Sequence, residues 1–445
     1  MFNIMMISLG CDKNTVDSEE MLGLLRSRGY GLTDDPEEAD AAIVNTCCFI
    51  QSATEESIQN ILDTAGLKQG KMKYLVAAGC MAERYKEQMF EEFPEIDAMV
   101  GTTGFVAIAD VLDRLRSGET KVTNFESIDK LTEVDTDRVI TAHPYMEYLK
   151  IAEGCDKRCT YCAIPYFRGK YRSVPMSTLV SKAKKLADDG VKELILVAQE
   201  TTCYGIDLYK KKSLHTLLHR LSEIEGIQWI RLLYCYPEEI YPELIEEIAE
   251  NKKVLHYIDM PLQHTEDDIL RRMGRRMNKE ILYDIVEKLR QRIPDIAIRT
   301  TLITGFPGET EEQHESLMET INELEFDRLG VFTYSPEEGT PAAKFEGQID
   351  EEVKARYRDE IMELQQEISY DKNQLMLGKH LDVMVEGYIP DEDVYVARSY
   401  KDAPDVDGFV FVRCEHELMS GSIIPVVITG ADEYDLTADI VEEDY

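Results

Sequence analysis

Apolar and polar positions alternate along the first quarter of the chain in a way that predicts strands and helices in turn. The predicted strands are residues 4–9, 41–44 and 74–78. Residues 18–28 carry leucine and methionine at helical spacing, and Gly29 ends that pattern. Because strands that alternate with helices form parallel sheets, we predict a doubly wound parallel sheet over residues 1–116. Residues 117–140 are polar and lack a clear period, so we interpret them as a linker.

The alternation restarts near residue 147 with a longer period. The predicted strands of this second region are residues 148–152, 193–197, 229–234, 254–260, 297–302 and 329–333. Six successive strand–helix units predict a partial (β/α) barrel over residues 141–371. A charged amphipathic helix, residues 350–378, leads out of it.

Short apolar runs separated by Gly, Pro and Asp clusters fill the end of the chain. The runs are residues 381–385, 394–397, 408–412 and 423–429. They predict a small antiparallel β-barrel over residues 374–441. The fold class is therefore an α/β multidomain protein with a terminal β-barrel.

Charge changes the picture of possible partners, because the 445 residues carry a formal net charge of -37. Such a protein does not suit unassisted binding to nucleic acid, whose phosphates need clustered Lys and Arg. It favours a basic partner, although acidity also simply keeps proteins in solution. No run is long enough to cross a membrane, and no basic residue precedes Lys13 as in a signal peptide, so we expect a cytoplasmic protein.

Three of the ten cysteines, Cys155, Cys159 and Cys162, have the spacing C-x3-C-x2-C directly after the first predicted barrel strand. Three thiolates on one loop hold three corners of a [4Fe–4S] cube and leave the fourth iron free to chelate S-adenosylmethionine (SAM). A zinc site is the alternative, but it needs a fourth ligand and no His or Cys stands nearby.

This motif resembles that of the radical SAM superfamily, with Tyr161 at the aromatic position before the last cysteine. Residues 198–201, 259–264 and 301–309 also match at the ends of later strands. The resemblance implies SAM contacts at Tyr161, Gln199, Glu200, Gln263, Arg299 and Gly305. It identifies no protein side chain as a general base.

Cys11, Cys47 and Cys80 each come at or just after the end of a strand predicted in the first region. The carboxyl ends of parallel strands meet at one edge, so these thiols can share a second [4Fe–4S] cluster. The alternative is three ordinary buried cysteines. Residues 8–19, with Asn-Thr-Cys at 45–47 and Gly-Cys at 79–80, resemble the N-terminal domain of radical SAM methylthiotransferases. Cys48 departs from that pattern and is a possible competing ligand.

The resemblance, with a terminal TRAM barrel, covers the whole chain and implies attachment of a methylthio group. The Lys-Asn pair at 13–14 resembles the RimO type, whose substrate is an aspartate of the twelfth small-subunit ribosomal protein, free or on the ribosomal subunit. Residues 374–445 hold 17 acidic and 4 basic side chains, which suits such a basic partner. A sulfur donor and a low-potential electron donor are implied as well.

Three alternatives stay open from sequence alone: the tRNA-modifying (MiaB) type, a non-catalytic iron–sulfur electron-transfer protein and a zinc-stabilised adaptor.

Overall fold

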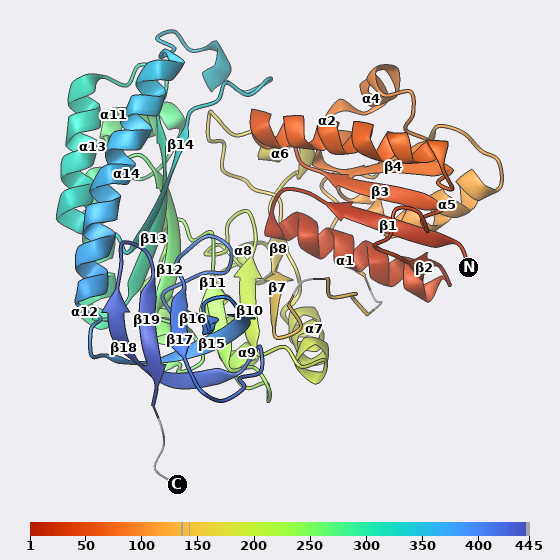
Figure 1. Cartoon of the computed structure of the whole chain (residues 1–445). Coiled ribbons are helices and arrows are strands. Elements are labelled where there is room, and N and C mark those ends of the chain that lie inside the picture. The colour runs from red at the N-terminus through yellow and green to blue at the C-terminus, as the bar shows by residue number, and fades with distance from the viewer. Residues whose placement is uncertain (135–136, 142, 442–445) are drawn as a thin grey trace.

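The structure is a computed structural model that describes residues 1–134, 137–141 and 143–441. Figure 1 shows three units: an N-terminal sheet covered by helices, a central set of strands backed by helices, and a small C-terminal barrel below it. None of the described helices combines the length and the apolar composition that crossing a membrane requires.

The N-terminal unit is a six-stranded parallel sheet with the order β2-β1-β3-β4-β5-β6. Its strands are β1 (Asn3–Ser8), β2 (Gly31–Leu32), β3 (Ala41–Thr46), β4 (Tyr74–Gly79), β5 (Ala98–Val100) and β6 (Val122–Asn124). Helices α1 (Asp12–Ser27) and α5 (Ile108–Arg116) pack on one face. Helices α2 (Gln51–Gly66), α3 (Cys80–Tyr85) and α4 (Glu87–Glu92) pack on the other. The predicted doubly wound sheet is confirmed.

Two details of this unit differ from the sequence-based expectation. Helix α1 begins at Asp12 rather than near residue 18, because its first turns bury polar residues such as Asn14 and Asp17, which hide the apolar pattern. The segment interpreted as a linker contains β6, which pairs in parallel with β5 at the edge of the sheet.

The central unit has six parallel strands in two sheets, β11-β10-β7 and β12-β13-β14. The strands are β7 (Met146–Lys150), β10 (Glu193–Val197), β11 (Trp229–Leu232), β12 (Tyr257–Gln263), β13 (Ala297–Thr304) and β14 (Arg328–Thr333). A bridge between Ile230 and Val254 links the two sheets. The result is the expected partial barrel.

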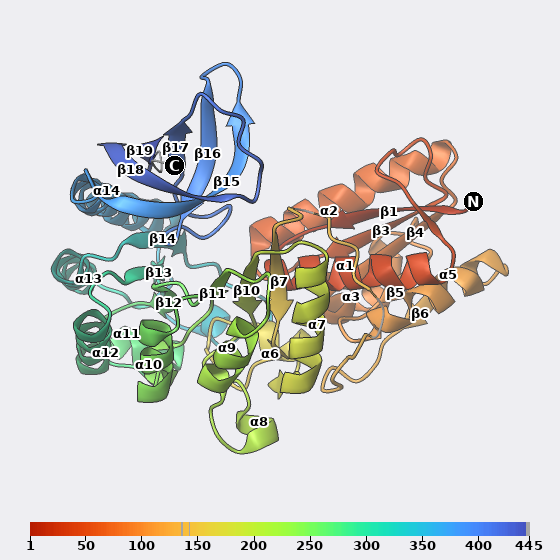
Figure 2. The ribbon, with the colours of Figure 1, turned by 90° about the horizontal axis from the view of Figure 1, so that it is seen from below.

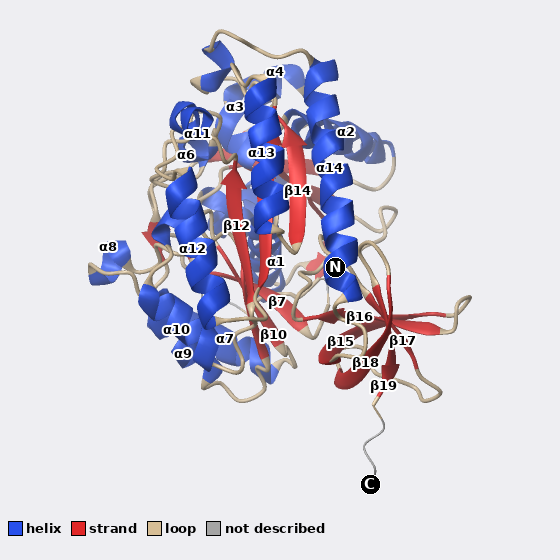
Figure 3. Ribbon diagram, turned by 90° about the vertical axis from the view of Figure 1, so that its left-hand side faces the viewer, coloured by secondary structure: helices blue, strands red, loops and turns tan. Residues whose placement is uncertain are grey.

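Helices cover the outside of this barrel, as Figure 3 shows in blue. They are α7 (Met176–Asp188), α9 (Leu214–Ser222), α10 (Pro242–Glu250), α11 (Asp267–Met273), α12 (Lys279–Arg292), α13 (Glu311–Leu324) and α14 (Glu351–Gln374). The loops hold the short helices α6 (Ile164–Phe167) and α8 (Ile206–Tyr209). The two-residue strands β8 (Ala152–Glu153) and β9 (Arg172–Ser173) pair antiparallel beside β7.

The C-terminal unit is a closed five-stranded barrel with the order β15-β16-β17-β19-β18. Its strands are β15 (His380–Ile389), β16 (Val394–Ser399), β17 (Val410–Arg413), β18 (Ile423–Ala431) and β19 (Leu436–Ile440). Four of its pairs are antiparallel, but β17 and β19 run parallel, which short apolar runs do not reveal. The predicted small barrel is confirmed, and Figure 2 shows it packed beside β14 and α14.

Buried ion pairs hold the C-terminal barrel against the central strands. Arg398 of β16 is fully buried and donates to Glu193 of β10 at 2.8 Å. Glu193 also accepts from Arg231 of β11 at 2.8 Å. Burial raises the pKa of Glu193, but Arg398 and Arg231 hold it below its usual value. Arg398 also donates to Glu386 of β15 at 2.5 Å, so among the described residues its removal leaves Glu193 with Arg231 alone and Glu386 without its cation.

Replacing Arg398 with Met should therefore lower the free energy of unfolding by about 3 to 5 kcal/mol. The measurement is denaturant unfolding, combined with limited proteolysis of the α14–β15 junction. The matched control is Arg413→Met, an exposed residue of β17, which should change stability by no more than about 0.5 kcal/mol. Equal stability of the two variants would contradict the role given to the Glu193 pair.

Candidate functional site

The barrel cysteines lie on the loop that follows β8, at the carboxyl end of the strands. Gly154 turns the chain into this loop with a φ of 78°, and a Cβ there would stand 2.2 Å from the carbonyl oxygen of Lys170. Burial raises the pKa of Cys155 to about 12, and Cys159 raises it further. Burial, Cys159 and Cys155 likewise raise the pKa of Cys162. The three thiols thus lie near enough to raise one another's pKa, with Cys155 and Cys159 buried and Cys162 half-buried, and loss of their protons requires a positive partner such as iron.

Backbone hydrogen bonds fix the cysteine loop to two later loops of the barrel. The amide of Thr160 donates to the carbonyl of Met273 at 2.8 Å, and the amide of Ala342 donates to the carbonyl of Thr160 at 2.9 Å. The loop is therefore positioned by α11 and by the segment after β14.

Several buried polar atoms near the carboxyl ends of the barrel strands have no hydrogen-bond partner among the described residues. They include Oε1 of Gln199 after β10 and Oγ1 of Thr265 after β12. The carboxylate of Glu238 after β11 also has no hydrogen bond, but it lies 3.6 Å from Nζ of Lys157 and 3.6 Å from Nη2 of Arg275. Nε and Nη1 of Arg275 also lack a partner, although the guanidinium lies 4.1 Å from the ring centroid of Tyr236. Since buried polar groups are nearly always paired, these atoms fit a polar ligand such as SAM.

Three of the residues expected to contact SAM lie at this end of the barrel. Tyr161 is half-buried against an apolar cluster that includes Phe306 and Tyr334. Gln199 donates through Nε2 to Glu153 at 2.8 Å, which leaves its Oε1 free. Gln263 ends β12 in the left-handed region with a φ of 74°, beside an irregularity in the strand register. Their assignment to SAM stays a prediction.

The structure gives the other three expected SAM residues different partners. Glu200 accepts hydrogen bonds from the amides of Thr202 and Cys203 at 2.8 and 3.1 Å and so closes its own loop. Arg299 donates to Asp259 at 3.1 Å and to Asp407 of the C-terminal barrel at 3.3 Å.

Gly305 is required for a packing reason, because a Cβ there would stand 2.2 Å from Cγ of Lys354 on α14. Glu200, Arg299 and Gly305 thus have contacts within the protein, and their assignment to SAM stays a prediction.

The N-terminal cysteines follow three adjacent strands, β1, β3 and β4. Gly10 precedes Cys11 with a φ of 91°, and a Cβ on it would stand 2.8 Å from Sγ of Cys47. Burial raises the pKa of Cys80 well above its usual value; Arg168 opposes the rise, and Cys48, Cys47 and Cys11 all add to it. The topology therefore brings the three thiols together at one edge of the sheet, as the strand-end argument predicts.

Cys48 lies in a different environment from its neighbour Cys47. It is fully buried in the apolar core beneath α2 and α3. Burial raises its pKa to about 12, and the side chain of Arg84 opposes that rise by a hydrogen bond. Cys47 instead faces Gly10, and its amide and carbonyl are both bound to the hydroxyl of Ser57 at 3.0 and 2.8 Å. This geometry favours Cys47 over Cys48 as the ligand.

Both cysteine sets suit a four-iron cube better than a single ion. Among the described residues, no group of three or more His, Cys, Asp or Glu is arranged to hold one metal ion. In a cube each thiolate binds a different iron, so the sulfur atoms stand farther apart than the ligands of one zinc. All six cysteines are free thiols, without a disulfide. The donor sets therefore fit two [4Fe–4S] clusters, each with one iron that lacks a protein ligand.

Arg168 joins the two sites, and sequence reasoning missed it. It follows α6, six residues after Cys162, and its Nε and Nη2 lie 3.3 and 3.2 Å from Sγ of Cys80. Its Nη1 donates to Asp17 at 2.8 Å and to Glu153 at 3.1 Å. Burial raises the pKa of Glu153, but Arg168 and Lys150 lower it to about 2. A hydrogen-bonded path thus runs from Gln199 through Glu153 and Arg168 to Cys80.

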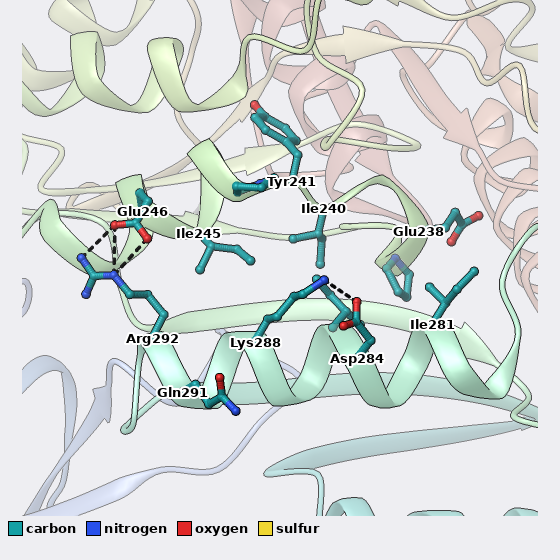
Figure 4. A pocket seen from close by; sticks show the side chains of 13 residues that line it. Glu238, Ile240, Tyr241, Ile245, Glu246, Ile281, Asp284, Lys288, Gln291 and Arg292 are labelled. Atoms are coloured by element: carbon teal, nitrogen blue, oxygen red, sulfur yellow. Dashed lines mark hydrogen bonds and ion pairs between the residues drawn. The ribbon is translucent and has the colours of Figure 1, made fainter.

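A groove of about 490 Å³ lies between α10 and α12. Figure 4 shows Ile245 and Ile281 among its lining residues, with ion pairs between Arg292 and Glu246 and between Lys288 and Asp284. None of its lining residues is a cysteine.

Three family models match successive parts of the chain. The model described as Uncharacterized protein family UPF0004 matches residues 3–101, the Radical SAM superfamily matches residues 149–321, and the TRAM domain matches residues 377–441. These matches coincide with the three units of the fold.

Curated relatives match over nearly their whole length. The chain is 56% identical over 434 residues to ribosomal protein uS12 methylthiotransferase RimO of Lachnoclostridium phytofermentans, covering 97% of this chain and 98% of the relative. It is 48% identical to the protein of the same name from Acetivibrio thermocellus, covering 98% of each.

Solved structures share the fold at low identity. The radical SAM methyltransferase TsrM from Kitasatospora setae has a TM-score of 0.55 at 14% identity and covers 74% of this chain and 73% of that one. The cobalamin-dependent radical SAM enzyme OxsB has a TM-score of 0.52 at 13% identity and covers 82% and 56%.

Proposed function

Since the chain belongs to the RimO family of radical SAM methylthiotransferases, we propose that it attaches a methylthio group to the β-carbon of an aspartate in ribosomal protein uS12. The observation that carries the proposal is the pair of three-thiol sites, one on the N-terminal sheet and one on the barrel loop, joined through Arg168. Two such sites suit a reaction that needs both a radical and a sulfur source.

We assign one cluster to Cys155, Cys159 and Cys162 and the other to Cys11, Cys47 and Cys80. When bound, the barrel cluster and SAM supply a radical that removes hydrogen from carbon, and the N-terminal cluster supplies the sulfur. Gln199 and Arg275 have free buried donors or acceptors for the polar groups of SAM. Arg168 sets the position of Cys80 relative to the barrel loop, because it contacts both units.

A sulfur donor and a low-potential electron donor complete the proposed reaction. The proposed reaction takes place in the cytoplasm, where ribosomal protein is available. The test is side-by-side assay of anaerobically reconstituted protein, reductant and SAM with uS12, free or on the small subunit, and with tRNA. A mass gain of one CH2S unit on the target aspartate supports the proposal. Modified tRNA with unmodified uS12 overturns it and favours the tRNA type.

The acidic C-terminal barrel favours the protein substrate over tRNA, because a surface that binds nucleic acid is normally basic. The sequence points to six acidic residues of this barrel: Asp391, Glu392, Asp393, Asp402, Asp405 and Asp407. Asp402 and Asp407 prove to be buried partners of Arg328 and Arg299, so they hold the barrel in place and are not part of a free surface. The exposed members are Asp391, Glu392, Asp393 and Asp405.

Reversing the three charges of the β15–β16 turn, Asp391, Glu392 and Asp393, to Lys should slow association with uS12 at low salt. Raising ionic strength from about 0.15 to about 1 M shortens the Debye length from about 8 to about 3 Å and should slow the wild type similarly. Stopped-flow binding measures both effects. A control that reverses Glu312, Glu315 and Glu319 on α13 keeps the same net charge and should have a smaller effect. Equal slowing by both triple variants would exclude a docking role for the turn.

A further inference from the structure

Lys13 is a buried cation without an acidic partner. The described residues contain three buried lysines: Lys13, Lys354 and Lys401. Lys354 pairs with Glu351 at 2.7 Å and Lys401 with Asp327 at 3.1 Å. Lys13 is only 6% exposed, yet no described carboxylate lies within 4 Å of its ammonium. Asp12 and Cys11 act on this ammonium only from beyond ion-pair distance. Buried charges are normally paired in direct contact, so a ligand that carries a negative charge can still bind Lys13.

The position of Lys13 gives that ligand a place. The residue stands in the first turn of α1, two positions after Cys11, and Figure 1 shows this end of α1 turned toward the barrel. Its ammonium lies 3.4 Å from the ring centroid of Tyr234, which follows β11. The carbonyl of Tyr234 accepts from the amide of Thr201 at 3.0 Å, so the ring belongs to the barrel end that carries Gln199.

Other half-buried groups surround the same point. Tyr234 donates to Asp12 at 3.1 Å, and neither Cys11 nor Tyr148 is fully buried. Asp12 and the exposed Asp405 both raise the pKa of Tyr148, after the larger effect of burial, so charges of the N-terminal unit and of the C-terminal barrel both act on this ring. Lys13 itself lies where the N-terminal unit meets Tyr234 of the central barrel.

We infer that the Lys13 ammonium binds the side-chain carboxylate of the aspartate that is modified. The inference rests on the proposed function, since it takes the substrate to be an aspartate. The carboxylate is bonded directly to the β-carbon, so a cation near Cys11 that holds it also places that carbon between the two cysteine sets. The ammonium of a lysine can bind such a carboxylate because it is a compact charge with three hydrogen-bond donors.

The test uses peptides that carry the target loop of uS12 with Asp, Asn or Ala at the modified position. Binding to the reconstituted protein is measured by fluorescence anisotropy, without turnover. Wild type should bind the Asp peptide about 10- to 100-fold more tightly than the Asn peptide, as a charge-assisted hydrogen bond permits. Lys13→Met should reduce that ratio to about one, and Lys13→Arg should keep part of it. Lys182→Met, which removes a cation paired with Glu20 at the interface, should leave it unchanged.

The outcomes separate the two proposals. Wild type that binds Asp and Asn peptides equally overturns the inference and leaves the proposed function in place, and this comparison requires no variant to fold. Lys13→Met that keeps the Asp preference but melts at lower temperature also overturns it, because Lys13 then serves only to pack on Tyr234. Wild type that binds none of the peptides and methylthiolates tRNA overturns the proposed function itself.

Discussion

Replacing Cys155, Cys159 and Cys162 together with Ala should abolish the reductive cleavage of SAM. The three thiols share one loop, and the assignment leaves the fourth iron without a protein ligand. The other two thiols at that end of the barrel, Cys203 and Cys235, stand singly after β10 and β11, and Cys235 contacts the hydroxyl of Thr201 at 3.3 Å. Product 5′-deoxyadenosine, measured by chromatography, should fall to background. Iron content should fall from about eight to about four per chain, because the N-terminal cluster has its own ligands.

The matched variant replaces Cys11, Cys47 and Cys80 instead. It should also keep about four irons and should still release 5′-deoxyadenosine, while methylthio product disappears. A further control, Cys48→Ala, should keep about eight irons, since Cys47 and not Cys48 faces Gly10 beside Cys11. If both triple variants cleave SAM equally poorly, the division of labour between the two sites is wrong. Loss of all iron from either triple variant would show that the clusters are not independent.

The sequence alone predicts the architecture well because strand-end chemistry follows from topology. Cys11, Cys47 and Cys80 are separated by more than thirty residues each, but parallel strands bring their carboxyl ends to one edge. The same argument places Cys155 at the mouth of the barrel. What the local pattern does not show is the contact that each residue after a strand makes inside the protein. Glu200 and Gly305 stand at such positions and are used by a turn and by α14.

Contacts between the three units cannot be predicted from the periodicity of apolar and polar residues in the sequence. Arg275 belongs to a basic group that, as sequence, is typical of a solvated helix face, yet its guanidinium is buried on Tyr236. Lys13 and Arg168 are likewise ordinary basic residues until folding places them beside Tyr234 and Cys80. Their partners lie more than eighty residues away, so neither helical nor strand periodicity reports them. Buried polar residues inside the amphipathic helix α1, such as Asn14 and Asp17, are the one available signal.

Arg168→Met should be the most damaging single substitution at the interface of the N-terminal unit and the barrel. The guanidinium is buried and serves Cys80, Asn14, Asp17 and Glu153 at once. Without Arg168, Lys150 is the one described cation still paired with the carboxylates of Asp17 and Glu153. Burial disfavours the charged form of both carboxylates. Removing one member of a buried ion group costs about 3 to 5 kcal/mol, so denaturant unfolding should show a loss of that size.

The same change should reduce iron in the N-terminal site, because Asn14 and Arg168 contact Cys80 and hold the end of β4 near β1. Asn14 donates to the carbonyls of Leu9 and Thr46 at 2.8 and 3.0 Å, so it ties the first two cysteine loops together while its Oδ1 accepts from Arg168. In a chain that already lacks Cys155, Cys159 and Cys162, iron should fall from about four toward zero.

Arg168→Lys should be intermediate, since one ammonium cannot replace a planar fork of donors. Arg28→Met, an exposed partner of Asp110 on the same unit, should cost at most about 0.5 kcal/mol and no iron. Arg168→Met with wild-type stability and iron would show that the two units are held in register by their apolar contacts, and that the buried charges between them are dispensable.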